Sequence, residues 1–177
     1  SLHDALPISV AVQAQRARKG YAGERRCILV VDNEEPDREL LVQLLEPLGF
    51  ELRQAASGHD ALDLLATGYR PHVIFMDLAM PGIDGWETLR RVRQMALPDL
   101  HCAIVSANAF DQALDNDVGI TPADFLVKPV RRDDLLDWLG RHLRLEWVDT
   151  AAGAPAATGS GSADPARADR QASGPCH

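Results

Sequence analysis

The sequence predicts an α/β fold: a parallel sheet of five strands with helices on both faces. Short apolar runs such as Cys27–Val31 and residues 73–76, which stop at a carboxylate, have the length and composition of strands that are buried on both faces. These runs alternate with segments in which leucines recur at helical spacing, as expected of strand–helix–strand units. Because right-handed crossovers bring the carboxyl ends of parallel strands to one edge, the polar residues that end these runs are expected to meet there.

The N-terminal residues 1–26 are predicted to be a linker or the end of a preceding domain. Residues 6–12 have the composition of a short strand, and residues 13–26 form a basic segment interpreted as a solvated connector. The first strand of the sheet is then predicted at Cys27–Val31. Pro36 suits the first turn of the following helix because its missing N–H is not needed there.

The remaining elements follow from the same two patterns. Strands are predicted at Glu51–Ala55, Val73–Asp77, His101–Ser106 and 124–127, and helices at 36–48, Gly58–Ala66, 86–95, 109–118 and 132–145. Residues 27–146 are therefore assigned to one domain. Residues 147–177 are rich in Ala, Gly, Pro and Ser and lack periodicity, so they are predicted to be a disordered tail.

Composition excludes several classes of function. A net charge of −8 and a pI near 5.1 argue against nucleic-acid binding. No apolar run reaches the ~18 residues that cross a bilayer, so no membrane contact is expected. No signal peptide is evident either. The three cysteines lack metal-ligand spacing, and Cys27 and Cys102 are interpreted as buried free thiols, which is typical of a cytoplasmic protein.

Polar residues follow four of the predicted strands. Asp32 and Asn33 follow the first strand, Asp77 ends the third, Ser106 ends the fourth and Lys128 follows the fifth. Carboxylate oxygens are suitable Mg²⁺ ligands. A metal ion, an ammonium and a hydroxyl at one edge could together bind the oxygens of a phosphoryl group. Asp77 would then be the nucleophile, since carboxylates form aspartyl phosphates.

Four segments, ILVVDNEE, VIFMDLAMPGIDG, AIVSANAF and FLVKPV, together resemble the receiver domain of two-component response regulators, over about residues 27–146. The resemblance implies a flavodoxin-like sheet in the order 2-1-3-4-5. It implies that Asp77 is the phosphoacceptor and that Ser106 and Lys128 bind the phosphoryl group. Ser106 and Phe125 match the residues that switch conformation, and the bond between Lys128 and Pro129 resembles one that is usually cis.

The resemblance also implies a magnesium site. Asp32 and Asn33 match the acidic pair that holds Mg²⁺, with Asp77 and the backbone carbonyl of Ala79 as further ligands. Asn33 departs from the family, which usually has Asp at this position. Two like charges ~4 Å apart interact by about 4 kcal/mol at an effective dielectric near 20. Losing one carboxylate is therefore expected to weaken metal binding and to ease the charge crowding around Asp77.

The partners and the context follow from the same resemblance. A histidine kinase or a histidine phosphotransfer protein would supply the phosphoryl group, and the chain itself would be an acceptor rather than an enzyme. The surface formed by residues 109–118, 124–127 and 132–145 would change on phosphorylation, and dimerisation through it is a further expectation. The flanks GYAGERRCILVVD and GRHLRLEW resemble the joins around the C-terminal receiver of hybrid sensor histidine kinases.

Two other classes of function compete with this interpretation. The first is a receiver-like interaction module that is not phosphorylated because Asn33 weakens Mg²⁺ binding. The second is an enzyme or carrier on a similar sheet. An aspartate-nucleophile phosphatase needs a second Asp two residues after the first, where this chain has Ala79. A flavin carrier needs a glycine-rich phosphate loop after the first strand, and DNEEPD has the opposite charge.

Overall fold

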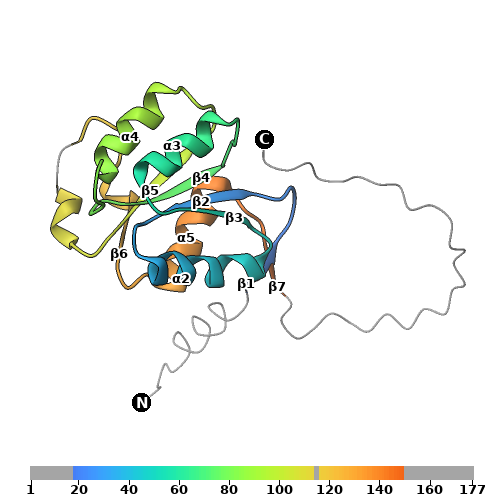
Figure 1. Cartoon of the computed structure of the whole chain (residues 1–177). Coiled ribbons are helices and arrows are strands. Elements are labelled where there is room, and N and C mark those ends of the chain that lie inside the picture. The colour runs from blue at the N-terminus through green and yellow to red at the C-terminus, as the bar shows by residue number, and fades with distance from the viewer. Residues whose placement is uncertain (1–17, 114–115, 150–177) are drawn as a thin grey trace, which may run out of the picture.

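The protein has a five-stranded parallel sheet at its centre (Figure 1). The structure, a computed structural model, describes residues 18–113 and 116–149. The sheet order is β3-β2-β4-β5-β6, with strands at Cys27–Val31 (β2), Glu51–Ala55 (β3), Val73–Asp77 (β4), His101–Ser106 (β5) and Phe125–Val127 (β6). Counted from β2, this is the predicted order 2-1-3-4-5, so the predicted fold class is confirmed.

The register of the strands positions the site residues at one edge. Val31 in β2 lies opposite Met76 in β4, so Asp32 and Asp77 follow at the same level. Asp77 lies opposite Val105, and Ser106 lies opposite Val127 in β6. Asp32, Asp77, Ser106 and Lys128 are therefore brought to the carboxyl edge of the sheet by strand pairing alone.

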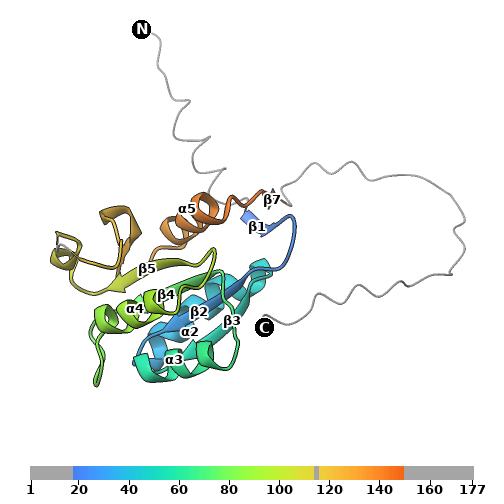
Figure 2. The same cartoon turned by 90° about the horizontal axis from the view of Figure 1, so that it is seen from above.

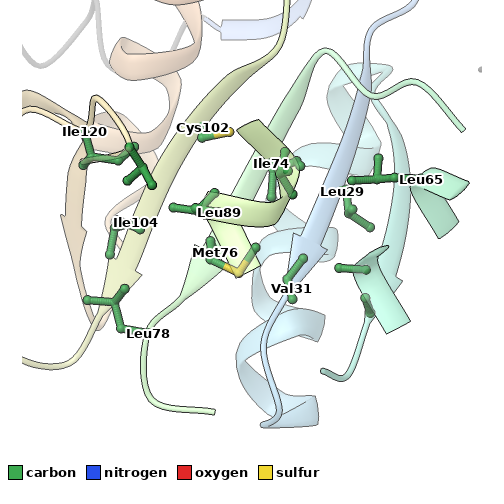
Figure 3. Packing of buried hydrophobic residues seen from close by; sticks show 14 of the residues in the cluster. Leu29, Val31, Leu65, Ile74, Met76, Leu78, Leu89, Cys102, Ile104 and Ile120 are labelled. Carbon is green, nitrogen blue, oxygen red and sulfur yellow. The ribbon is translucent and has the colours of Figure 1, made fainter. Parts of the chain in front are cut away.

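Four α-helices cover the two faces of the sheet (Figure 2). They are Glu35–Leu45 (α2), Gly58–Ala66 (α3), Gly85–Gln94 (α4) and Arg132–Leu143 (α5), and the 3₁₀ helix Glu46–Leu48 (η1) extends α2. Alternate strand residues point to opposite faces. Leu29, Ile74 and Ile104 pack against α3 and α4, as Figure 3 shows, and their neighbours in the strands pack against α2 and α5.

The predicted helix at 109–118 is confirmed only in its first half, and there as a 3₁₀ helix. Only Ala109–Ala113 form a 3₁₀ helix (η2), and residues 116–119 are not helical; residues 114–115 lie outside the description. Local side-chain bonds compete with a helix in this segment. Asn108 Oδ1 accepts a hydrogen bond from Phe110 N, and Asn116 Oδ1 accepts from both Val118 N and Ile120 N. Another 3₁₀ helix, Pro122–Asp124 (η3), then leads into β6.

The domain extends beyond the predicted limits of 27–146. Strand Arg18–Tyr21 (β1) pairs antiparallel with Trp147–Asp149 (β7), and we call these two strands the terminal strand pair. Residues 18–21 were predicted as linker and 147–149 as tail. They are ordered by aromatic packing: the ring of Tyr21 lies 4.5 Å from that of Phe50, and 6.5 Å from that of Trp147. The predicted strand at 6–12 and the rest of the tail lie outside the described residues.

The buried cysteines differ from each other. Cys102 is a free thiol in the core between the sheet and α4, as predicted. Cys27 is also buried but is disulfide-bonded, so the prediction of a free thiol is wrong at this position. Within residues 18–113 and 116–149, no helix has the length and apolar character needed to cross a bilayer.

Candidate functional site: a carboxylate–lysine cluster at the sheet edge

Asp77 is the last residue of β4 and is 5% exposed. The loop that follows it turns back tightly, and the backbone N–H of Gly85 donates to the carbonyl of Leu78 at 3.1 Å. A side chain at position 85 would overlap the carbonyl oxygen of Asp77, so glycine is needed there. Asp84 then caps α4 by accepting a hydrogen bond from Glu87 N at 2.8 Å. The loop therefore holds Asp77 in a fixed position at the sheet edge.

Lys128 joins the carboxylates of three different elements. Its Nζ donates to Asp32 Oδ2 at 2.7 Å, to Asp37 Oδ2 at 2.8 Å and to Asp77 Oδ1 at 3.2 Å. Its backbone N–H donates to the carbonyl of Ser106 at 2.9 Å, which continues the pairing of β5 with β6. The bond between Lys128 and Pro129 is cis, as the resemblance predicted.

The cluster has more negative than positive charge. Burial raises the pKa of Asp77, and the nearby charge of Asp32 raises it further, while Lys128 opposes both. Burial disfavours the ammonium of Lys128, but hydrogen bonds to Asp32 and Asp37 outweigh this and raise its pKa. Lys128 is therefore positively charged at neutral pH, and a single ammonium balances three carboxylates.

A divalent cation fits this excess of negative charge. Asp32 and Asp77 are both buried and both contact the ammonium of Lys128, so the two carboxylates face the same point at the sheet edge and are the candidate ligands of such an ion. Within the described part of the chain, no group of three or more His, Cys, Asp or Glu side chains is arranged to hold a metal. Any further ligands would therefore have to include other groups, such as the amide of Asn33 or a backbone carbonyl.

The structure does not bring Asn33 into the cluster. Its Nδ2 donates to Glu34 Oε1 at 3.2 Å, on the exposed side of the loop after β2. Glu34 N in turn donates to Asp32 Oδ1 at 2.8 Å, so this loop positions Asp32 through its backbone. Ala79 is exposed in the loop that follows Asp77. Asn33 and Ala79 thus lie in the loops that follow Asp32 and Asp77, and their roles as metal ligands stay predictions.

Ser106 is buried at the same edge, and its hydroxyl is bonded to residues of the segment that follows β5. Its Oγ donates to Asp111 Oδ2 at 2.8 Å and accepts from Asn108 N at 3.1 Å. Phe125 is 8% exposed, and its ring lies 6.0 Å from that of Trp86. The switching roles predicted for Ser106 and Phe125 stay predictions.

Sequence reasoning missed two carboxylates that contact the predicted site. Asp37 lies in the first turn of α2, five residues after Asp32. Its position directly after an acidic loop is the sequence feature that could have placed it in the site. Asp111 lies in η2, where a helix was predicted, and nothing in the sequence indicates its bond to Ser106.

An open groove of about 970 Å³ also begins beside Lys128 and follows β6 and α5 toward Trp147.

The parallel sheet carries a buried, lysine-bound aspartate at the end of its central strand, and its strand order is that of the flavodoxin-like α/β class. Comparison with known families identifies it further: residues 28–139 match the family model described as the response regulator receiver domain. The chain therefore belongs to the response regulator receiver family of two-component signal transduction.

Curated relatives agree with this assignment. The chain is 32% identical over 139 residues to the positive alginate biosynthesis regulatory protein of Pseudomonas aeruginosa, covering 76% of this chain and 54% of that one. It is 34% identical over 132 residues to response regulator MprA of Mycolicibacterium vanbaalenii, covering 73% and 55%. The chain thus spans about half the length of these relatives. It is also 30% identical over 123 residues to hybrid signal transduction histidine kinase L of Dictyostelium discoideum, covering 65% and 7%.

Solved structures of receiver proteins have the same fold. The bacteriophytochrome response regulator AtBRR aligns with a TM-score of 0.61 and 28% identity, over 73% of this chain and all of that one. The Vibrio cholerae chemotaxis protein CheY4 aligns with a TM-score of 0.57 and 28% identity, over 66% of this chain and 98% of that one. The terminal strand pair lies outside residues 28–139, the range that matches the family model.

Proposed function

We propose that this domain accepts a phosphoryl group from a phosphohistidine onto Asp77 and changes its interaction surface as a result. The observation that carries this proposal is the contact of buried Asp77 with Lys128, which also binds Asp32. An oxygen of Asp77 attacks phosphorus, the O–P bond forms and the P–N bond of the phosphohistidine breaks. The departing imidazole nitrogen takes up a proton.

The residues around Asp77 have distinct roles in this proposal. Lys128 neutralises charge that develops on the phosphoryl oxygens, and the tight loop ending at Gly85 keeps Asp77 aimed out of the sheet. Mg²⁺, held by Asp32 and Asp77 with Asn33 and the Ala79 carbonyl as the further candidates, would supply additional positive charge when bound. Ser106 donates its hydroxyl to the phosphoryl group once it leaves Asp111.

The partner in this proposal is a histidine kinase or a histidine phosphotransfer protein. The chain would be cytoplasmic, where kinases find ATP, and it would catalyse nothing beyond its own phosphorylation. One relative is a hybrid histidine kinase, which supports the idea that the parent protein is of that kind. The output surface would comprise η2, β6 and α5, of which β6 and α5 border the groove beside Lys128. The predicted dimerisation through this surface remains part of the proposal.

Labelling of the phosphoacceptor tests the proposal. With acetyl phosphate or a phosphorylated histidine kinase as donor and Mg²⁺ present, the wild-type protein is expected to form an acid-stable, base-labile phosphoprotein. Asp77→Asn is expected to abolish the label, because an amide is not a competent nucleophile. Asp63→Asn removes an exposed acid from α3 and serves as the matched control.

Two outcomes would contradict the proposal. Undiminished labelling of Asp77→Asn would place the phosphoryl group elsewhere. Absence of label in the wild-type protein, together with no Mg²⁺-dependent change in Trp86 fluorescence, would favour the interaction module that is not phosphorylated. Trp86 is a suitable reporter because it begins α4, directly after the loop that follows Asp77. Restoring the family pattern with Asn33→Asp then measures how much metal affinity the amide has lost.

A further inference from the structure

We propose that Asp37 is the releasable partner of Lys128. In the unmodified protein its carboxylate accepts a hydrogen bond from the Lys128 ammonium, and this bond breaks when a phosphoryl group binds. Asp37 thereby sets how readily the site accepts an anion. This inference rests on the proposed phosphoacceptor function and adds a residue that the family resemblance does not assign.

The first argument is a count of hydrogen-bond donors. A lysine ammonium has three N–H groups and no acceptor. Lys128 binds three carboxylate oxygens, one each from Asp32, Asp37 and Asp77, at 2.7, 2.8 and 3.2 Å. All three donors are therefore engaged. Lys128 can donate to a phosphoryl oxygen only if one of these carboxylates is released.

The second argument is the cost of releasing each carboxylate. The side chains of Asp32 and Asp77 are 5% and 6% exposed, whereas that of Asp37 is 42% exposed. A buried carboxylate without a partner pays a large desolvation penalty, while an exposed one is solvated by water. Asp32 is also held by Glu34 N at 2.8 Å. Asp77 becomes bonded to the phosphoryl group itself, so the choice lies between Asp32 and Asp37, and Asp37 leaves at the lower cost.

The third argument concerns charge. Asn33 contributes no charge to the loop after β2, yet three carboxylates still surround Lys128 because Asp37 reaches it from the first turn of α2. Asp37 uses its Oδ2 on the lysine, so it adds negative charge where an incoming anion must bind. Its effect is expected on anion binding and not on the metal ligands.

Binding of beryllofluoride tests this inference. This fluoride complex coordinates a carboxylate oxygen and mimics a phosphoryl group. Its affinity can be followed by Trp86 fluorescence at saturating Mg²⁺. Asp37→Asn is expected to bind it about three- to tenfold more tightly than the wild-type protein, because the competing charge-assisted bond is lost. Asp37→Glu keeps a carboxylate within reach and is expected to restore the wild-type affinity, which a merely structural role of Asp37 would not predict.

The control is Glu35→Gln, which removes one charge from the same helical turn. Glu35 is exposed and is absent from the ion pairs of Lys128. The affinity of the Glu35→Gln variant for beryllofluoride should therefore stay near that of the wild-type protein. An equal gain in this control would show a general charge effect and overturn the inference. Unchanged or weaker binding by Asp37→Asn would overturn it too, as would a loss of Mg²⁺ affinity measured without beryllofluoride.

Failure of the underlying function gives a different result. If the wild-type protein does not bind beryllofluoride, or if Asp77→Asn binds it equally well, the phosphoacceptor assignment is wrong. If the wild-type protein binds it at Asp77 but the Asp37 variants do not differ, only the inference about Asp37 is wrong.

Discussion

Two properties of Asp77 disfavour its negative charge. It is buried at the end of a central strand, and it lies next to a second buried carboxylate, Asp32. Both properties disfavour its charge, and Lys128 compensates only partly, so the pKa of Asp77 is raised. Burial and the neighbouring charge of Asp32 therefore cost stability at neutral pH.

Asp77→Asn is expected to stabilise the fold at pH 7. Because the pKa of Asp77 is higher in the folded than in the unfolded state, its contribution to stability declines as pH rises from the unfolded value through the folded one. Removing the charge should therefore raise Tm by about a few degrees at pH 7. The difference from the wild-type protein should shrink as the pH falls through the raised pKa of Asp77 and the side chain becomes protonated. Calorimetry across this pH range would contradict the idea if the variant melted lower at pH 7.

At the scale of elements, the start of α4 fixes the loop over Asp77. Gly85 approaches the β4 backbone so closely that an added Cβ would overlap the Asp77 carbonyl oxygen. The neighbouring Asp84 cap and the Gly85–Leu78 hydrogen bond depend on the same approach.

Gly85→Ala is expected to lower the free energy of unfolding by about 1–3 kcal/mol, as overpacking does. Urea denaturation would measure this loss, and phosphoryl labelling should fall with it because the loop moves. Gly20→Ala provides the comparison, since a Cβ at position 20 would meet only the Leu48 carbonyl oxygen at an ordinary 3.6 Å. Equal stability of the two variants would show that the loop can relax without cost.

The segment after β5 controls the hydroxyl of Ser106. A serine hydroxyl has one hydrogen to donate, and Ser106 gives it to Asp111, which also accepts from Asn108 Nδ2 at 3.2 Å. Ser106 can therefore reach a phosphoryl group only when η2 releases it.

Asp111→Ala is expected to raise the rate of labelling by acetyl phosphate by up to about tenfold, because a bond to a charged acceptor no longer has to break. Ser106→Ala should act in the opposite direction. Asp117→Asn is the control, since Asp117 is an exposed acid that bonds to Arg90 instead. A slower rate in Asp111→Ala would show that Asp111 assists Ser106 rather than withholding it.

For the whole molecule, the terminal strand pair joins the two ends of the described domain. Tyr21 donates its hydroxyl to the Gly49 carbonyl at 3.2 Å and accepts from Arg26 N at 2.9 Å. Arg18 pairs with Asp137 of α5 at 2.6 Å. The chain therefore enters and leaves the domain at the same place, through strands that pack against η1 and α5.

Tyr21→Ala is expected to destabilise the domain by about 2 kcal/mol, because a half-buried ring and two hydrogen bonds are lost. Tyr21→Phe keeps the ring and should lose about 1 kcal/mol. Urea denaturation of both variants separates packing from hydrogen bonding. Wild-type stability in Tyr21→Ala would mean that the terminal strand pair adds nothing to the folded state.

The sequence by itself determined the sheet and the ends of its strands. Runs such as Cys27–Val31 and Val73–Asp77 have one stable environment, a buried parallel strand, and parallel strands share one carboxyl edge. The meeting of Asp32, Asp77 and Lys128 was predictable for that reason. Residues at the ends of short, strongly patterned elements are positioned by the element and need no knowledge of side-chain packing.

Only the tertiary structure decided what those residues contact. Asp37 joins Lys128 across elements that are far apart in the chain, and Asp111 joins Ser106 from the neighbouring η2; no periodicity encodes either pair. The segment after β5 is not a regular helix because the side chains of Asn108 and Asn116 satisfy its backbone locally. The strand pair of Arg18–Tyr21 with Trp147–Asp149 forms because each strand is too short to be stable without the other and the surface around Phe50.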